Sequence, residues 1–157
     1  MIWPYVLRKS GVMEIAHSVE QVLGGKATLK ILPQTGGQWH TLIEAGLPAG
    51  ALESLKQATS LSDSQLASLL GVSGKTLQHA RASRERLDSV TSDRIFCTAR
   101  LVALAGEVLE DNERGIAWLG RSQIGLGGCV PFALMATETG CTQVEQLLLR
   151  IEHSVYA

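Results

Sequence analysis

The segment "LASLLGVSGKTLQHA", residues 66–80, constrains the fold more than any other part of the chain. Two short helical patterns meet there at Gly71, and two short helices cross steeply only when the residues at the crossing allow it. Ala67 is the small residue that such a crossing needs. Gly71 tolerates the positive φ of a tight turn, and Val72 can fill the corner between the helices. The spacing therefore predicts a helix-turn-helix.

The ends of these two helices carry matching capping signals. Ser62 and Gln65 form the pattern of a capping box before the first helix, and Ser73 can cap the second. One turn into the second helix, Leu77 supplies an inward apolar anchor, and Ala80 follows three residues later. Because all these requirements are met in register, the pattern favours a DNA-binding pair over a generic helical hairpin.

The second helix of the pair would present its polar face to the major groove of DNA. Gln78 can pair with adenine, Lys75 with guanine or a phosphate, and Thr76 with a phosphate or a thymine methyl group. The alternative is a merely solvated face, on which His79 is an ordinary surface residue. The residues predicted to contact DNA are Ser73, Gly74, Lys75, Thr76, Gln78, His79 and Arg81, with Ala82 further along the face and Arg84 and Arg86 suited to phosphates.

Helical periodicity continues through nearly all of the chain, so the sequence predicts an all-α protein. Apolar stripes indicate helices at residues 12–23 and 38–45, and a third helix that begins near Pro48. A longer helix, residues 92–109, is apolar around so much of its circumference that it should be central and buried. The exception is "ATLKIL", residues 27–32, whose brief alternation is typical of a strand.

The C-terminal part combines short helices with a glycine-rich turn. A short helix carries Trp118, and the turn that follows it ends at Pro131, which opens another short helix that Gly140 closes. Thr142 and Glu145 form the pattern of a second capping box, which predicts the start of the terminal helix. The apolar stripe of that helix consists of Val144, Leu147, Leu148, Ile151 and Val155.

The charge of the chain is unevenly distributed along its 157 residues, although the net charge is only −1. Residues 61–90 carry four basic and three acidic side chains, whereas residues 91–157 carry five basic and eight acidic ones. A contact with nucleic acid would therefore be local. The acidic C-terminal part suits a basic protein partner.

Other classes of protein lack their sequence signals here. The cysteines and histidines show no metal-ligand spacing, so we expect no metal, disulfide or cofactor. No catalytic set of titratable residues is evident, and "GLGG", residues 125–128, lacks the context of a phosphate-binding loop, so an enzyme is not expected. Without a signal peptide or a long apolar run, a cytoplasmic protein without membrane contact is expected.

The order of these features resembles the Xre/MbcA/ParS-type antitoxins, which accompany RES-domain toxins in bacterial toxin–antitoxin modules. The resemblance covers residues 45–157, and its most specific part runs from "AWLG" to "LGGCVPFALMATETG". It implies a chain that represses its own promoter and blocks a toxin, which is an enzyme that consumes NAD. It also implies at least a homodimer. A stand-alone repressor that senses a small ligand in its C-terminal domain remains the alternative.

We expect three regions in the chain. Residues 1–47 would be an N-terminal helical region and a candidate for dimerisation, residues 48–90 a helix-turn-helix domain of the Xre/Cro type, and residues 91–157 the toxin-binding domain. On the last turn of the chain, polar side chains lie off the apolar stripe and can reach a partner, whereas Trp118 also fits the pattern of a core residue. The residues expected to contact the toxin are Trp118, Leu126, Gly127, Glu152, His153 and Tyr156.

Overall fold

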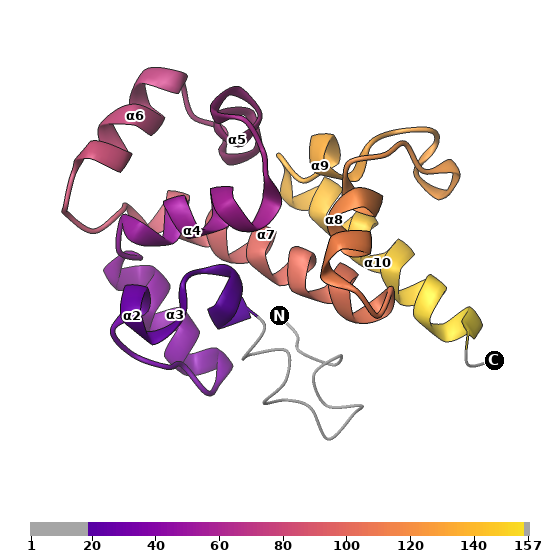
Figure 1. The fold of residues 1–157 in the computed structure, drawn as a ribbon, viewed down its shortest axis with the longest axis horizontal. Helices are drawn as coiled ribbons and strands as arrows, with labels where there is room; N and C mark the ends of the chain where they lie inside the picture. The colour runs from indigo at the N-terminus through magenta and orange to yellow at the C-terminus, as the bar shows by residue number, and fades with distance from the viewer. Residues whose placement is uncertain (1–18, 156–157) are drawn as a thin grey trace.

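The computed structural model describes residues 19–155, which form helices joined by short connections (Figure 1). These residues contain no β-strand, only two isolated backbone bridges, so the prediction of an all-α protein is confirmed. Residues 19–22 are helical, and the rest of the helix predicted from residue 12 lies outside the described residues. The further elements are α2 (Gly25–Leu29), α3 (Gly36–Ala45), α4 (Gly50–Thr59), α5 (Asp63–Leu70), α6 (Gly74–Ala82), α7 (Ser89–Val108), α8 (Asn112–Leu119), the 3-10 turn η1 (Ile124–Leu126), α9 (Pro131–Leu134) and α10 (Glu138–Val155).

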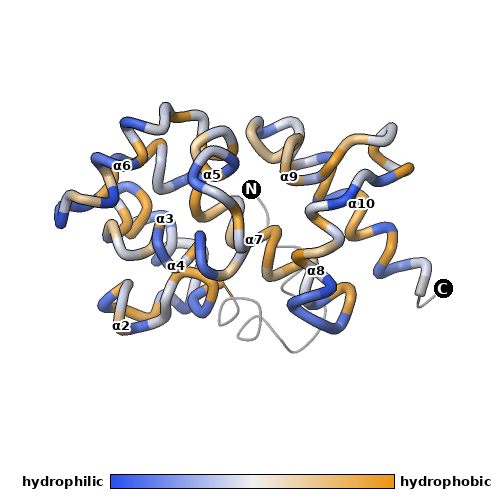
Figure 2. The backbone as a smooth tube through the Cα atoms, turned by 45° about the horizontal axis from the view of Figure 1, so that its top comes forward, coloured by the Kyte–Doolittle hydropathy of each residue, from blue (hydrophilic) through white to orange (hydrophobic). Residues whose placement is uncertain are grey.

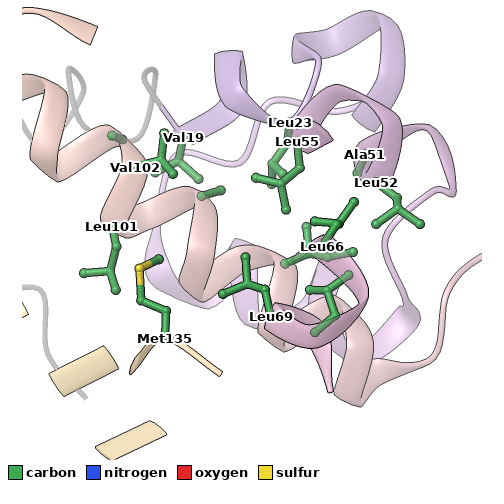
Figure 3. Close-up of a cluster of buried hydrophobic side chains, with 14 of the residues drawn as sticks. Val19, Leu23, Ala51, Leu52, Leu55, Leu66, Leu69, Leu101, Val102 and Met135 are labelled. Atoms are coloured by element: carbon green, nitrogen blue, oxygen red, sulfur yellow. The ribbon is translucent and has the colours of Figure 1, made fainter. Parts of the chain in front are cut away.

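The long helix α7 is central and buried, as its composition predicts (Figure 2). Every residue from Leu101 to Gly106 is buried, so α7 is covered around its whole circumference at this point. Helices α3, α4 and α5 contact it from the N-terminal part of the chain, and α8 and α10 contact it from the C-terminal part. The core is therefore continuous, and Figure 3 shows Met135, beside α9, pointing towards Leu101 of α7.

The start of α7 lies three residues before the predicted one, because Asp88 caps the helix. The backbone N–H of Thr91 donates to the Asp88 carboxylate at 2.8 Å, and this bond lowers the pKa of Asp88. Ser92 is consequently inside the helix and completely buried. Its hydroxyl accepts a hydrogen bond from the backbone N–H of Leu47 at 2.8 Å, which ties the segment before α4 to the central helix.

The helix-turn-helix has the geometry that its spacing predicts. Gly71 adopts φ 68°, and its N–H donates to the last turn of α5. Ala67 is buried, and its carbonyl accepts the N–H of Val72 at 3.0 Å. The capping box of Ser62 with Gln65 is present. The first helix therefore begins and ends at its predicted signals, the second begins after Ser73 as predicted, and hydrogen bonds fix the backbone of the turn.

The predicted strand at residues 27–32 is wrong, because this segment forms the end of α2 and the turn after it. Only Leu29 of its large apolar residues faces the core, whereas Ile31 and Leu32 are exposed. Lys30 ends the helix with φ 68°. A single helical turn with one buried leucine produces the same short alternation as a strand, so the pattern was ambiguous.

The predicted capping box at Thr142 is also wrong, because α10 already begins at Glu138. The hydroxyl of Thr137 accepts the N–H of Gly140 at 3.0 Å and caps the helix. Thr142 instead lies one turn inside α10, where its hydroxyl donates to the carbonyl of Glu138 at 3.1 Å. Gly140 does not close α9: it lies in α10, where a side chain would collide with the carbonyl of Leu134.

The start of α4 differs from the prediction in a smaller way. Pro48 lies two residues before Gly50, the first residue of the helix, and forms an isolated bridge with Arg86. Its carbonyl accepts the N–H of Ala51 at 3.0 Å. Pro48 therefore precedes the helix and joins it to the segment after α6.

Two glycines bring α7 and α8 into direct backbone contact. A Cβ atom at Gly115 would lie 2.6 Å from the backbone nitrogen of Gly106 and 2.9 Å from the carbonyl carbon of Ala105. We predict that Gly115→Ala lowers the free energy of unfolding by about 1–3 kcal/mol, because the backbones must separate. Urea denaturation measures the change, with Gly120→Ala as the control, since a Cβ there would meet nothing closer than 3.6 Å. Equal stability of the two variants would contradict the close packing.

Candidate functional site

One face of α6 is open to solvent. Lys75, Gln78 and His79 are exposed, while Leu77 on the opposite side is buried and Ala80 is half-buried. Residues three and four positions apart share a helix face, so the exposed side chains form one polar stripe. Helix α6 itself lies at the edge of the molecule (Figure 2). Six of the seven residues predicted to contact DNA are exposed here: Ser73, Gly74, Lys75, Thr76, Gln78 and His79.

The start of α6 is held in place by its own hydroxyl groups. Ser73 accepts the N–H of Thr76 at 3.1 Å, which confirms the predicted cap. The hydroxyls of Ser73 and Thr76 are also 2.8 Å apart. This end of the helix carries the positive end of the helix dipole and is suited to a phosphate.

Arg81, the seventh predicted DNA contact, turns away from the exposed face. Its guanidinium is 2.7 Å from the carboxylate of Glu53 in α4 and 2.7 Å from that of Asp63 in α5. Lys56 of α4 also lies 2.7 Å from Asp63. The geometry therefore favours a structural role for Arg81, in which it holds α6 against the two preceding helices.

The charges of this cluster determine the titration of Asp63. The hydrogen bond from Lys56, together with the positive charges of Arg81 and Lys56, holds the pKa of Asp63 below its ordinary value, although desolvation opposes them. Arg86 lies in the segment after α6 and donates to the carbonyl of Gly46 at 2.7 Å. This bond ties that segment to the end of α3.

The glycine-rich segment 120–130 forms an ordered loop. The N–H of Gln123 donates to the carbonyl of Cys129 at 3.0 Å, and the N–H of Gly128 donates back to Gln123 at 2.9 Å. The side chain of Gln123 also donates to the carbonyl of Trp118 at 2.9 Å, which ties the loop to α8. Gly127 and Gly128 have φ 66° and 84°, values that favour glycine.

Ile124 is the residue of this loop that the sequence analysis missed. Its side chain is 98% exposed, although isoleucine is usually buried. The next residue, Gly125, packs so tightly on α10 that a Cβ atom there would lie 2.7 Å from Leu147. An apolar side chain held in water on an ordered loop is available to a partner that can bury it. The sequence did contain one signal of this exposure, because Ile124 lies between the polar Gln123 and Gly125 within a glycine-rich turn.

The residues predicted to contact the toxin are placed differently from one another. Trp118 and Leu126 are half-buried and pack against the core. Gly127 is exposed on the loop. Glu152 is half-buried and His153 is exposed, and each already takes part in an interaction within the chain. Tyr156 lies outside the described residues. Among the predicted residues that the structure describes, Leu126 and Gly127 share the loop with Ile124, and the carbonyl of Trp118 is bonded to this loop through Gln123.

Cys129, on the same loop, is exposed. Burial raises the pKa of Cys97 to about 11 and also raises the pKa of Cys141. Cys129 is thus the thiol best suited to react with an alkylating reagent. In residues 19–155, no group of His, Cys, Asp or Glu side chains could hold a metal ion. None of the helices described is long and apolar enough to span a membrane.

Two family models match the chain, one over the helix-turn-helix and one over the C-terminal part that contains the loop 120–130. Residues 38–96 match the antitoxin Xre-like helix-turn-helix domain, which includes α5 and α6. Residues 104–153 match the antitoxin Xre/MbcA/ParS C-terminal toxin-binding domain, which includes the loop with Ile124.

The chain is also similar to curated proteins named Antitoxin Xre. The protein from Pseudomonas putida is 26% identical over 148 residues, which cover 93% of this chain and 87% of that protein. The protein from Yersinia enterocolitica is 27% identical over 116 residues, covering 73% and 78%. The protein from Photorhabdus laumondii is 21% identical over 122 residues, covering 77% and 82%.

The position of Asp63 between two cations makes stability depend on pH. The pKa of Asp63 is lower in the folded state than in the unfolded state. Asp63 therefore stabilises the fold when the pH is above its ordinary pKa, and this stabilisation is lost as the pH falls through the lowered pKa. We predict that Asp63→Asn is less stable than wild type above about pH 5 and that the difference shrinks below about pH 4. Denaturation across this range measures it, with exposed Asp93→Asn as control. A constant difference would contradict the ion-pair assignment.

Proposed function

The chain belongs to the Xre/MbcA/ParS-type antitoxins, and from this we propose that it is the antitoxin of a type II module whose toxin carries a RES domain. In this proposal the C-terminal domain binds and blocks the toxin, an enzyme that consumes NAD. The helix-turn-helix, bound as a homodimer or larger assembly, represses the promoter of the module. The domain boundaries after residues 47 and 90 are part of the proposal.

The observation that carries the DNA-binding part is the exposed stripe of α6. Lys75, Gln78 and His79 project from a helix that is capped at its start and held by Arg81 near its end. Side chains that read base edges must be presented on a fixed backbone, because hydrogen bonds to bases depend on geometry. A homodimer would present two such helices to half-sites about 10 bp apart, or a multiple of that spacing.

The toxin-binding part is supported by the loop 120–130. Ile124 offers an apolar anchor whose backbone is already ordered, so little entropy is lost when a partner covers it. The surrounding region, residues 91–157, has eight acidic and five basic residues. This excess complements a toxin whose pocket binds an anionic dinucleotide and is therefore basic.

The two proposed interfaces lie at opposite ends of the long axis of the molecule. In Figure 1, α6 is at one end, while the loop before α9 and the end of α10 are at the other. One chain can therefore contact DNA and toxin together.

The DNA-binding proposal is tested by two substitutions in α6. Gln78→Ala should cost about 1–3 kcal/mol at a single base-pair position, because the other positions are read by other side chains. Lys75→Ala should weaken binding to all sequences and reduce the salt dependence, as expected for a phosphate contact. Mobility-shift titrations against the promoter and its point variants measure both effects. Exposed Gln57→Ala, on α4, is the control, and wild-type behaviour of both α6 variants would refute the proposal.

The toxin-binding proposal is tested at Ile124. Ile124→Ser should weaken binding to the toxin by about 1.5–3 kcal/mol, the value of a buried aliphatic side chain. Val90→Ser is the matched control, because Val90 is also an exposed apolar residue, at 73%, but lies at the start of α7. Calorimetry with the purified toxin measures the affinity.

The same complex can be probed through Cys129. Its alkylation should slow when wild-type antitoxin binds the toxin, because the partner covers the loop. If Ile124→Ser binds as tightly as Val90→Ser and the alkylation rate is unchanged, the contacts lie elsewhere, for example on the last turn of α10 with His153.

A further inference from the structure

A groove of about 780 Å³ lies beside α6, between α2, the start of α4 and the segment that follows α6. Gln78 belongs both to the exposed stripe of α6 and to the wall of this groove. The groove is therefore directly continuous with the proposed DNA-reading face. Its polar and charged lining includes Lys30 directly after α2, Glu53 from α4, and Arg81 and Arg84 from α6 and the segment after it.

The wall that α2 forms is closely packed on α4. A Cβ atom at Gly24 would lie 2.5 Å from the hydroxyl oxygen of Ser54, and one at Gly50 would lie 3.1 Å from the Thr28 methyl group. Glycine at these two positions leaves room for the side chains of Ser54 and Thr28 between α2 and α4. The backbone of Lys30, which directly follows α2, is consequently fixed relative to α4, and α4 is joined to α6 by the ion pair of Arg81 with Glu53.

The groove has a positive charge balance. Three cations and one carboxylate line it. Because Arg81 pairs with Glu53 at 2.7 Å, Lys30 and Arg84 supply the net charge. Both side chains are exposed, and they come from two segments that line the groove, one after α2 and one after α6. In a chain with net charge −1, this concentration of cations beside α6 indicates an anionic ligand.

The position of the groove identifies that ligand. A helix in the major groove, which is about 12 Å wide, lies between the two phosphate strands of DNA. The strand on the Gln78 side of α6 must then run past Lys30 and Arg84. We propose that this groove holds a phosphodiester segment of the operator, with Lys30 and Arg84 as phosphate contacts. Helix α2 and its flanking turn would thus extend the DNA interface beyond the matched helix-turn-helix region, residues 38–96.

This inference rests on the proposed DNA-binding function and is tested separately from it. Lys30→Gln and Arg84→Gln should each weaken binding about five- to tenfold at 0.1 M salt, equally for operator and unrelated DNA. Each should reduce the slope of log affinity against log salt by about 1. Lys30→Arg, which keeps the charge, should retain the wild-type slope. Lys26→Gln is the matched control, because Lys26 lies in α2 but does not line the groove.

The possible outcomes separate the two hypotheses. If Lys30→Gln and Lys26→Gln have the same affinity and slope while Gln78→Ala loses discrimination, the groove proposal is wrong and the function of α6 stands. If Lys30→Arg loses as much affinity as Lys30→Gln, the effect is structural and the phosphate contact is refuted. If the wild-type chain does not bind its promoter, both hypotheses fail. A lower slope for Lys30→Gln and Arg84→Gln but not for Lys26→Gln, with the wild-type slope kept in Lys30→Arg, supports the contact.

Discussion

The burial of α7 on all sides is the constraint on which the rest of the structure depends. A helix at the surface needs only one apolar stripe, whereas residues 101–106 are buried without interruption and need neighbours all around. Both parts of the chain contribute neighbours to α7: α3, α4 and α5 contact it from one part, and α8 and α10 contact it from the other. The first matched domain ends at residue 96 and the second begins at residue 104, so both boundaries lie within α7. The two domains are therefore joined through this helix and share a core. Two domains that are distinct in the sequence thus do not have separate hydrophobic cores in the structure.

The two interfaces inherit their positions from this core through backbone contacts and ion pairs. On the C-terminal side, Gly115 lets α8 approach α7, and the loop that follows is held by Gln123 and by the contact of Gly125 with Leu147. On the N-terminal side, Arg81 holds α6 against α4 and α5. An isolated surface ion pair contributes little to stability, but a guanidinium shared between two carboxylates on two helices specifies orientation. Both sites are thus placed by contacts between their own elements and the helices packed behind them.

The features that sequence reasoning predicted are those encoded locally. The helix-turn-helix depends on spacings of three to five residues around Gly71, and the capping box of Ser62 needs nothing beyond its own turn. The start of α10 was missed because Thr142 and Glu145 match a cap, yet Glu145 pairs with Arg100 of α7, and Thr137 begins the helix earlier. The orientation of Arg81 and the exposure of Ile124 depend on contacts with other helices. Periodicity within one helix cannot report on such contacts.

The shared core also limits how the two interfaces can influence each other. A change at one site alters affinity at the other only if an element between them has two arrangements of similar free energy. A shift of α7 would open cavities among the fully buried Ile95, Leu101 and Ala105, and such voids cost about 24 cal/mol for each Å³. We therefore expect α7 to act as a rigid connection. Coupling between toxin and DNA would then arise from the number of antitoxin chains that one assembly brings to the operator, because linked binding sites raise the effective concentration without any change in shape.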